Sequence, residues 1–199
     1  MKKAYCLIAL TLFLFNHALA DDIGEIAKAK CLKCHANDPA SNDSPRLGAQ
    51  TPEYIFQTLK DYQAGNRRGV DALKLMTKKL KGMDEATLKG LAEYFAKTEP
   101  LPPVVGDATL MAQGKDIYEN GIKGKDVRAC ADCHGHAGEG GGDNSALNPR
   151  VAGQWQWFLY NQLAAYKSQD IVNQKKMTEM AAKMSDIEAK AVTTYMQAL

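Results

Sequence analysis

Two copies of the pattern Cys-x-x-Cys-His occur in the chain, at residues 31–35 and 130–134. Two thiols three residues apart lie on one helical turn, so both can bond to the vinyl groups of one porphyrin. The imidazole that follows can then bind the haem iron. The motifs therefore predict two covalently bound haem c groups. The predicted attachment residues are Cys31, Cys34, Cys130 and Cys133, and the predicted axial ligands are His35 and His134.

Other chemistry of paired cysteines fits the sequence less well. A redox-active Cys-x-x-Cys is expected in a βαβ setting, and a structural zinc site is expected to draw ligands from two separated knuckles. Neither setting is visible in the sequence. His136 has no second ligand-type residue beside it, and we expect it in a solvated loop.

A sixth ligand decides whether such an iron carries electrons or binds small molecules, because a His/Met pair closes both axial positions. Met76 and Met177 recur at equivalent places in predicted lysine-rich loops, each seven residues before another methionine. We predict Met76 and Met177 as the sixth ligands. The later pair, Met83 and Met184, stand at the head of apolar helical stripes and are expected in the core. Core packing is the alternative for the first pair as well.

The N-terminus has the pattern of a secretory signal peptide. Lys2 and Lys3 precede an apolar run from 7 to 15, and Ala18-Leu19-Ala20 forms a cleavage site. The pattern predicts export to the periplasm with cleavage after Ala20. Cys6 would leave with the leader, so all four remaining cysteines belong to the haem motifs and none is left for a disulfide.

The charge balance excludes one class of partner. The formal net charge is +2, and loss of Lys2 and Lys3 would bring it to zero. A nucleic-acid-binding protein is expected to carry a basic excess, so nucleic acid is not predicted as a partner. Docking to other proteins must then depend on local charged patches.

The haem motifs lie in an internal repeat of roughly one hundred residues, the size of a small domain. After each motif, Pro45-Arg46 with Gln50 matches Pro149-Arg150 with Gln154. A proline-rich stretch from Glu99 to Pro103 separates the copies, as in a semi-extended spacer. The predicted organisation is a signal peptide at 1–20, an N-terminal domain at 21–99, a linker at 100–106 and a C-terminal domain at 107–199.

The elements that position these residues are predicted to be helices. Thr51 is a candidate N-cap before Pro52, and Gly65 ends the following apolar pattern. A helix starting at Asp84 places its apolar residues on one stripe, and Ser185 to Glu188 has the spelling of a capping box. No alternating strand pattern is present, so the predicted fold class is all-α.

Together the haem motif, the Pro-Arg-x-x-x-Gln stretch, the loop methionine and the closing helix resemble class I cytochromes c. Two such units in one exported chain resemble the dihaem cytochrome c4 family over nearly all of residues 21–199. The resemblance implies two domains related by a pseudo-twofold axis, with the haem propionates facing the domain interface. It also implies that the carbonyls of Pro45 and Pro149 hold the ligand histidines, and that Arg46 and Arg150 neutralise propionates.

The resemblance implies a periplasmic electron carrier rather than an enzyme. The expected partners are redox proteins: a quinol-oxidising donor and a terminal oxidase or reductase, with docking to a membrane complex included. One alternative is the dihaem subunit of a periplasmic dehydrogenase of the flavocytochrome c type. The other is a dihaem peroxidase or thiosulfate-oxidising enzyme, which needs one iron with an open or unusual ligand.

Overall fold

The computed structural model describes residues 22–36, 44–68 and 71–199. The predicted leader and its cleavage site lie outside the described residues. Within the described ranges the chain is helical and has no extended strand, only the isolated bridges between Arg67 and Ile171 and between Ile122 and Val127. The all-α prediction is therefore confirmed. No helix in these ranges is both long enough and apolar enough to cross a membrane.

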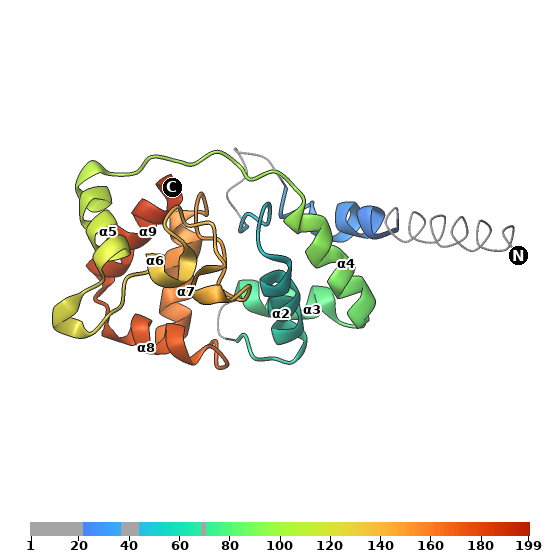
Figure 1. The fold of residues 1–199 in the computed structure, drawn as a ribbon. Coiled ribbons are helices and arrows are strands. Elements are labelled where there is room, and N and C mark those ends of the chain that lie inside the picture. Colours follow the sequence, from blue (N-terminus) through green and yellow to red (C-terminus); the bar gives the residue numbers. More distant parts are fainter. Residues whose placement is uncertain (1–21, 37–43, 69–70) are drawn as a thin grey trace, which may run out of the picture.

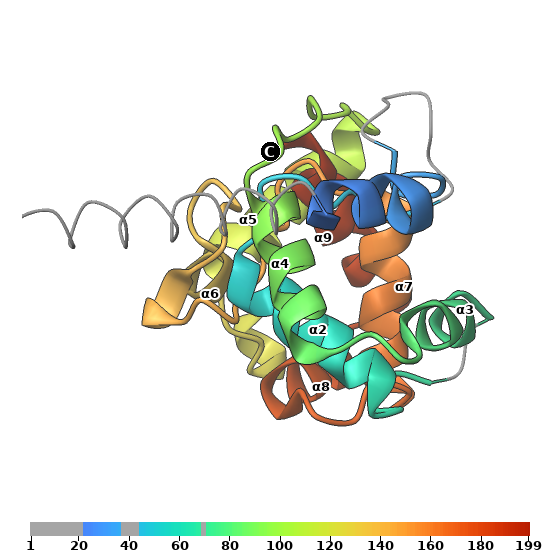
Figure 2. The same cartoon turned by 90° about the vertical axis from the view of Figure 1, so that its right-hand side faces the viewer.

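The helices form two groups that follow the sequence repeat (Figure 1). The first half contains the π-helical turn η1 (Ala27–Cys31) and the helices α2 (Pro52–Gln63), α3 (Asp71–Leu80) and α4 (Glu85–Ala96). The second half contains α5 (Ala108–Asn120), η2 (Lys123–Lys125), α6 (Ala131–His134), η3 (Gly142–Asn144), α7 (Gln156–Lys167), α8 (Lys175–Lys183) and α9 (Asp186–Ala198). Figure 2, seen from the side of the first half, shows α2 and α4 in front of the second-half helices.

Local sequence signals explain where the repeated helices begin and end. Pro52 occupies the first turn of α2, where its missing N–H costs no hydrogen bond, and Gly65 follows the helix with a φ of +72°. Asp84 caps α4 by accepting a hydrogen bond from the Thr87 N–H at 2.8 Å. These predicted helix boundaries are confirmed.

The predicted capping box of the last helix is also present. The Ser185 hydroxyl accepts from the Glu188 N–H, and the Glu188 carboxylate accepts from the Ser185 N–H at 2.7 Å. Each side chain thus satisfies a backbone donor that the first turn of α9 leaves free.

Glycines allow the terminal helices of each half to pack closely. A Cβ on Gly114 of α5 would lie 2.1 Å from the Ala191 carbonyl oxygen of α9. On Gly90 of α4, a Cβ would lie 2.7 Å from the Ile23 side chain. In both halves the closing helix therefore crosses the N-terminal segment at a position where a larger residue would force the two apart.

Each half has its own hydrophobic core. The predicted apolar stripe of α4 is buried, and it packs against α2 and the segment before the first haem motif; its residues are Leu88, Leu91, Ala92 and Phe95. The main cluster of the second half joins α5, α7 and α9 and includes Ile117, Tyr118, Leu159 and Val192. No buried cluster of the described residues combines side chains from both halves. The fold is accordingly two helical units in tandem, each with its own core.

Equivalent positions of the two halves meet near a pseudo-twofold axis. Arg67 and Ile171, which form a bridge, each lie five residues after an equivalent tyrosine, Tyr62 or Tyr166. Segment 97–107 connects α4 to α5 along one side of the molecule (Figure 1). It is held there by hydrogen bonds between Val104 and Gln197 of α9.

Candidate haem sites and the seam between the halves

Both Cys-x-x-Cys-His motifs form one helical turn. The His35 N–H donates to the Cys31 carbonyl at 2.9 Å, and the His134 N–H donates to the Cys130 carbonyl at 2.9 Å. The second turn continues into α6, whereas the first follows η1, in which the Leu32 N–H reaches the carbonyl of Ala27, five residues back. This π-helical turn was not predicted. In both places the two thiols lie on one turn, as attachment to a single porphyrin requires.

The two histidines are oriented by the prolines that the resemblance implied. His35 Nδ1 lies 2.9 Å from the Pro45 carbonyl oxygen, and His134 Nδ1 lies 2.8 Å from that of Pro149. A carbonyl only accepts, so Nδ1 carries the proton and Nε2 is left free to bind a metal. Burial lowers the pKa of both histidines, although the bond to the proline carbonyl acts in the opposite direction. Each imidazole is therefore kept neutral, in the form that binds iron.

Cys31 and Cys130 lack the stabilised thiolate of redox-active or metal-binding cysteines. Burial raises the pKa of the Cys31 thiol and raises that of Cys130 to about 12. Reactive and zinc-binding cysteines need a stabilised thiolate and hence a lowered pKa. The described part of the chain contains no group of three His, Cys, Asp or Glu side chains that could hold a metal ion. These features favour thioether attachment of haem over the two rival uses of the motif.

The glycine-rich segment after the second motif packs directly against it. The Gly140 N–H donates to the His134 carbonyl at 2.8 Å, and Tyr118 donates its hydroxyl hydrogen to the Gly135 carbonyl at 2.6 Å. A Cβ on Gly142 would lie 2.6 Å from the Cys133 carbonyl oxygen. The segment therefore fixes the backbone around His134. His136 is exposed, as predicted.

Of the four methionines, only Met184 is fully buried, and Met76, Met83 and Met177 are half-buried. Met184 is buried in the main core of the second half, and Met83 packs against both clusters of the first. Met76 lies on α3 and Met177 on α8, both half-buried at the margin of smaller clusters, so the prediction that they lie in loops was wrong. The core positions expected for Met83 and Met184 are thus observed. Ligation by Met76 and Met177 stays a prediction.

A cavity of about 520 Å³ lies beside the first motif, between Cys34 and the exposed face of α3 around Leu75. It joins the segment that carries His35 to the helix that carries Met76. A flat group attached to Cys34 could enter the structure here without displacing a core side chain. The first half is therefore compatible with a haem at its motif.

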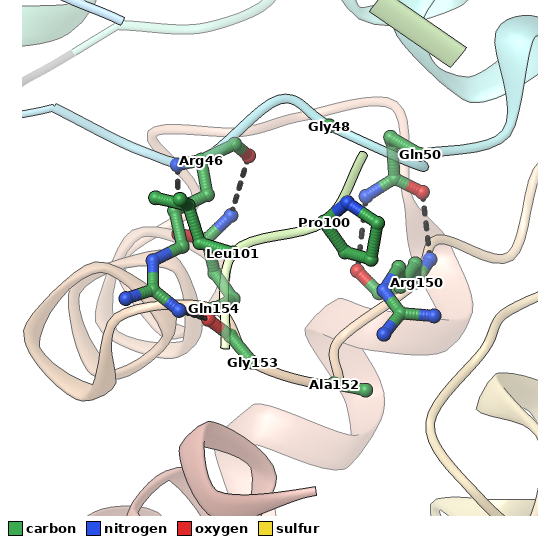
Figure 3. Close-up of a pocket in the computed structure, with 9 residues that line it drawn as sticks. All are labelled: Arg46, Gly48, Gln50, Pro100, Leu101, Arg150, Ala152, Gly153 and Gln154. Carbon is green, nitrogen blue, oxygen red and sulfur yellow. Dashed lines mark hydrogen bonds between the residues drawn. The ribbon is translucent and has the colours of Figure 1, made fainter. Parts of the chain in front are cut away.

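The two halves meet in a seam of reciprocal hydrogen bonds (Figure 3). The Gln50 amide donates to the Arg150 carbonyl at 2.9 Å and accepts from the Arg150 N–H at 2.7 Å. The Gln154 amide makes the same pair of bonds to the Arg46 backbone, at 2.8 and 3.0 Å. The arrangement obeys the pseudo-twofold symmetry. In each half, the backbone of the arginine that follows the ligand-orienting proline is bonded to a glutamine of the other half.

Arg46 provides polar atoms that lack a partner among the described residues. Its guanidinium stacks 3.7 Å above the Trp155 ring and donates through Nη1 to the carbonyls of Pro102 and Gly153. Its Nε and Nη2 atoms and Trp155 Nε1 are buried, with no hydrogen-bond acceptor among the described residues. Buried donors are normally satisfied, so an acceptor of another kind is expected. Haem carboxylates would fit this donor set.

A second contact between the halves buries two charged residues that were not predicted as functional. Asp61 Oδ1 accepts from Asn173 of the second half at 2.6 Å, and Arg67 Nη1 donates to Gln162 at 3.0 Å. Asp61 and Arg67 are 2% and 3% exposed. The Arg67 guanidinium also lies 5.4 Å from the centre of the Tyr62 ring. The seam is therefore polar along both contacts.

Comparison with known proteins identifies the class and the family. The "Cytochrome c" family model matches residues 111–199. Cytochrome c4 of Pseudomonas aeruginosa is 30% identical over 208 residues, covering 100% of both chains, and that of Thiocapsa roseopersicina is 34% identical over 179 residues, covering 87% of this chain and 88% of the relative. The structure of cytochrome c4 from Acidithiobacillus ferrooxidans matches with a TM-score of 0.77 at 26% identity, over 86% of this chain and 99% of that one.

The fold and the paired motifs define a dihaem c-type cytochrome built from two class I units. Within that class, the chain belongs to the cytochrome c4 family of electron-transfer proteins.

Proposed function

We propose that this protein is a periplasmic carrier that passes single electrons between respiratory redox proteins through two His/Met-ligated haems. The observation that carries the proposal is the repeated proline-held histidine, and each half also has a half-buried methionine at an equivalent position, on α3 or α8. A site with both axial positions filled exchanges electrons without binding a substrate. Export through the leader at 1–20, and domains at 21–99 and 107–199 joined by 100–106, are parts of the same proposal.

Haem supplies the ferrous/ferric couple, and the chain supplies position, burial and ligand field. His35 and His134 hold their protons on Nδ1 and offer Nε2. The glycine-rich segment fixes the backbone around His134. Arg46, with its unpartnered guanidinium atoms, is proposed to neutralise propionate charge at the seam. Arg150 is proposed to act in the same way. Its backbone is held by Gln50.

The proposed partners are a quinol-oxidising donor and a terminal oxidase or reductase. The main alternative is the electron-transfer subunit of a flavin-containing dehydrogenase, which would use the same two sites. Copurification with a flavoprotein would favour that alternative. A dihaem peroxidase or thiosulfate-oxidising enzyme would need one iron without a methionine ligand.

The test is to remove each methionine. We expect the oxidised wild-type protein to show the weak red absorption band of Met-ligated ferric haem, and each site to account for part of it. Met177→Ala should abolish the part of the band that comes from the second-half haem. It should also lower the reduction potential of that haem in an optical redox titration and leave the first-half haem nearly unchanged. Met76→Ala should do the converse, because a thioether stabilises ferrous iron.

Matched controls are the neighbouring core methionines. Met83→Leu and Met184→Leu should keep the band and both potentials, at a cost in stability below about 1.5 kcal/mol for a swap of similar volume. If Met177→Ala left band and potentials unchanged, Met177 would not be a ligand. If Met184→Leu removed the band instead, the assignment within the pair would be reversed.

A further inference from the structure

The cavity beside the first haem motif is ringed by positive charge. Four lysines line it together with Cys34 and Leu75, and no acidic residue of the described chain takes part; they are Lys30, Lys33, Lys78 and Lys79. All four are exposed, and none forms an ion pair within the described residues. Unpaired like charges around one opening repel each other, so they lower stability slightly unless something negative approaches.

The equivalent surface of the second half has a different charge. Counting from the matched cysteines and methionines, the four lysines correspond to Ala129, Asp132, Glu179 and Met180. Four positive charges of the first half thus correspond to two negative ones of the second, and Leu75 corresponds to the positively charged Lys176. The acids of the second half are also paired, Asp132 with Arg128 at 3.1 Å and Glu179 with Lys175 at 3.8 Å. The charge at the two haem motifs therefore breaks the pseudo-twofold symmetry of the fold.

An apolar side chain lies within the positive ring. Leu75 is 48% exposed on α3, next to the predicted ligand Met76, and Cys34 is also exposed. A haem held through Cys34 would lie beside this surface. An apolar centre with a charged rim is the usual form of a protein interface, and it suits a partner that binds briefly and leaves.

We propose that this face, defined by Lys30, Lys33, Cys34, Leu75, Lys78 and Lys79, is the docking site for the acidic face of a redox protein. Electrons would then be exchanged with that partner through the first-half haem. The occupant must be a redox protein rather than another polyanion, because only such a partner can exchange an electron at the haem edge. This inference rests on the proposed carrier function.

The test uses the reduced holoprotein and plant plastocyanin, a soluble acidic copper protein that serves as the electron acceptor. Oxidation is followed by stopped flow at several salt concentrations. For the wild type we expect a second-order rate constant that falls steeply with salt, because charges steer the encounter. Lys78→Glu with Lys79→Glu should lower it roughly tenfold at low salt. Lys30→Glu with Lys33→Glu, on the opposite wall, should do the same.

The matched control changes two exposed lysines of the second half, Lys123→Glu with Lys190→Glu, which alters the net charge equally. It should change the rate constant by less than about twofold. If the rate constant fell equally in the control and test variants, the net charge of the protein and not this face would set the rate. If neither pair of test substitutions lowered the rate constant, the face would not be used for docking. Either result overturns the proposal.

Two further measurements separate other causes. Complete bleaching of the ferrous bands by ferricyanide in each variant shows that both haems still carry electrons, so a failure of docking is distinguished from a failure of the carrier function. Sedimentation with phosphatidylglycerol vesicles tests a lipid surface. If the lysine variants lost vesicle binding and kept the plastocyanin rate, the face would bind membranes and the proposal would be wrong.

Discussion

Single side chains hold the two halves in register. Gln50 and Gln154 each bond to the backbone of an arginine in the other half, and that arginine follows the proline whose carbonyl holds a histidine. The sequence revealed these glutamines as a repeated letter after Pro-Arg. It could not reveal their partners, because a bond between residues about a hundred positions apart depends on how the halves dock. Asp61 and Arg67 were missed for the same reason.

The seam bonds predict that a substitution in one half changes backbone protection in the other half. Gln50→Ala leaves the Arg150 N–H and carbonyl without partners, and each buried unsatisfied group costs about 1–3 kcal/mol. We expect faster amide hydrogen exchange at Arg150 in the reduced holoprotein, and Gln154→Ala should accelerate exchange at Arg46. Gln113→Ala, at an exposed position on α5, is the control and should leave both amides protected. Unchanged protection at Arg150 in Gln50→Ala would show that the seam does not depend on this bond.

Helix boundaries were predicted best from the sequence, because the residues that begin and end a helix lie next to it in the chain. Pro52, Gly65, Asp84 and the Ser185 capping box all mark boundaries that the structure confirms. Thr51 is only partly as expected: it precedes α2, but its hydroxyl donates to the Ala146 carbonyl of the other half instead of capping the helix. The turn η1 was not foreseen, since no residue pattern distinguishes a π-helical turn from an α-helical one.

The capping box predicts a pH dependence. Hydrogen bonds from Lys125 and Ser185 lower the pKa of Glu188 from 4.5 to about 2. The ionised Glu188 carboxylate therefore stabilises the folded state above pH 4.5. This stabilisation is lost as the pH falls toward 2, because the carboxylate of the unfolded chain is protonated at a higher pH than that of the folded chain. Glu188→Gln should therefore reduce the loss of stability between neutral pH and pH 3, and Ser185→Ala should cost about 1 kcal/mol at neutral pH.

Guanidinium unfolding followed by circular dichroism at both pH values measures these effects. Glu93→Gln, on the exposed side of α4, is the control and should retain the acid sensitivity of the wild type. If Glu188→Gln lost as much stability between neutral pH and pH 3 as the wild type, this carboxylate would not be a source of the acid sensitivity.

At the scale of the whole molecule, the fold repeats while its surface does not. The two separate cores follow from the repeat in the sequence, whereas the symmetric seam bonds became visible only in the structure. The lysine-lined face of the first half has no equivalent in the second. A duplicated fold can therefore present two different surfaces to partners, since exposed positions change at little cost in stability.

The central claim, that each iron is closed on both sides by a histidine and a methionine, is tested most directly by adding carbon monoxide to the fully reduced wild-type protein. A filled sixth position should exclude the gas, and we predict an unchanged Soret band under saturating carbon monoxide. Stoichiometric binding at one haem would show that this iron has no firm sixth ligand. That result would contradict the carrier function and favour an enzyme or gas-binding protein.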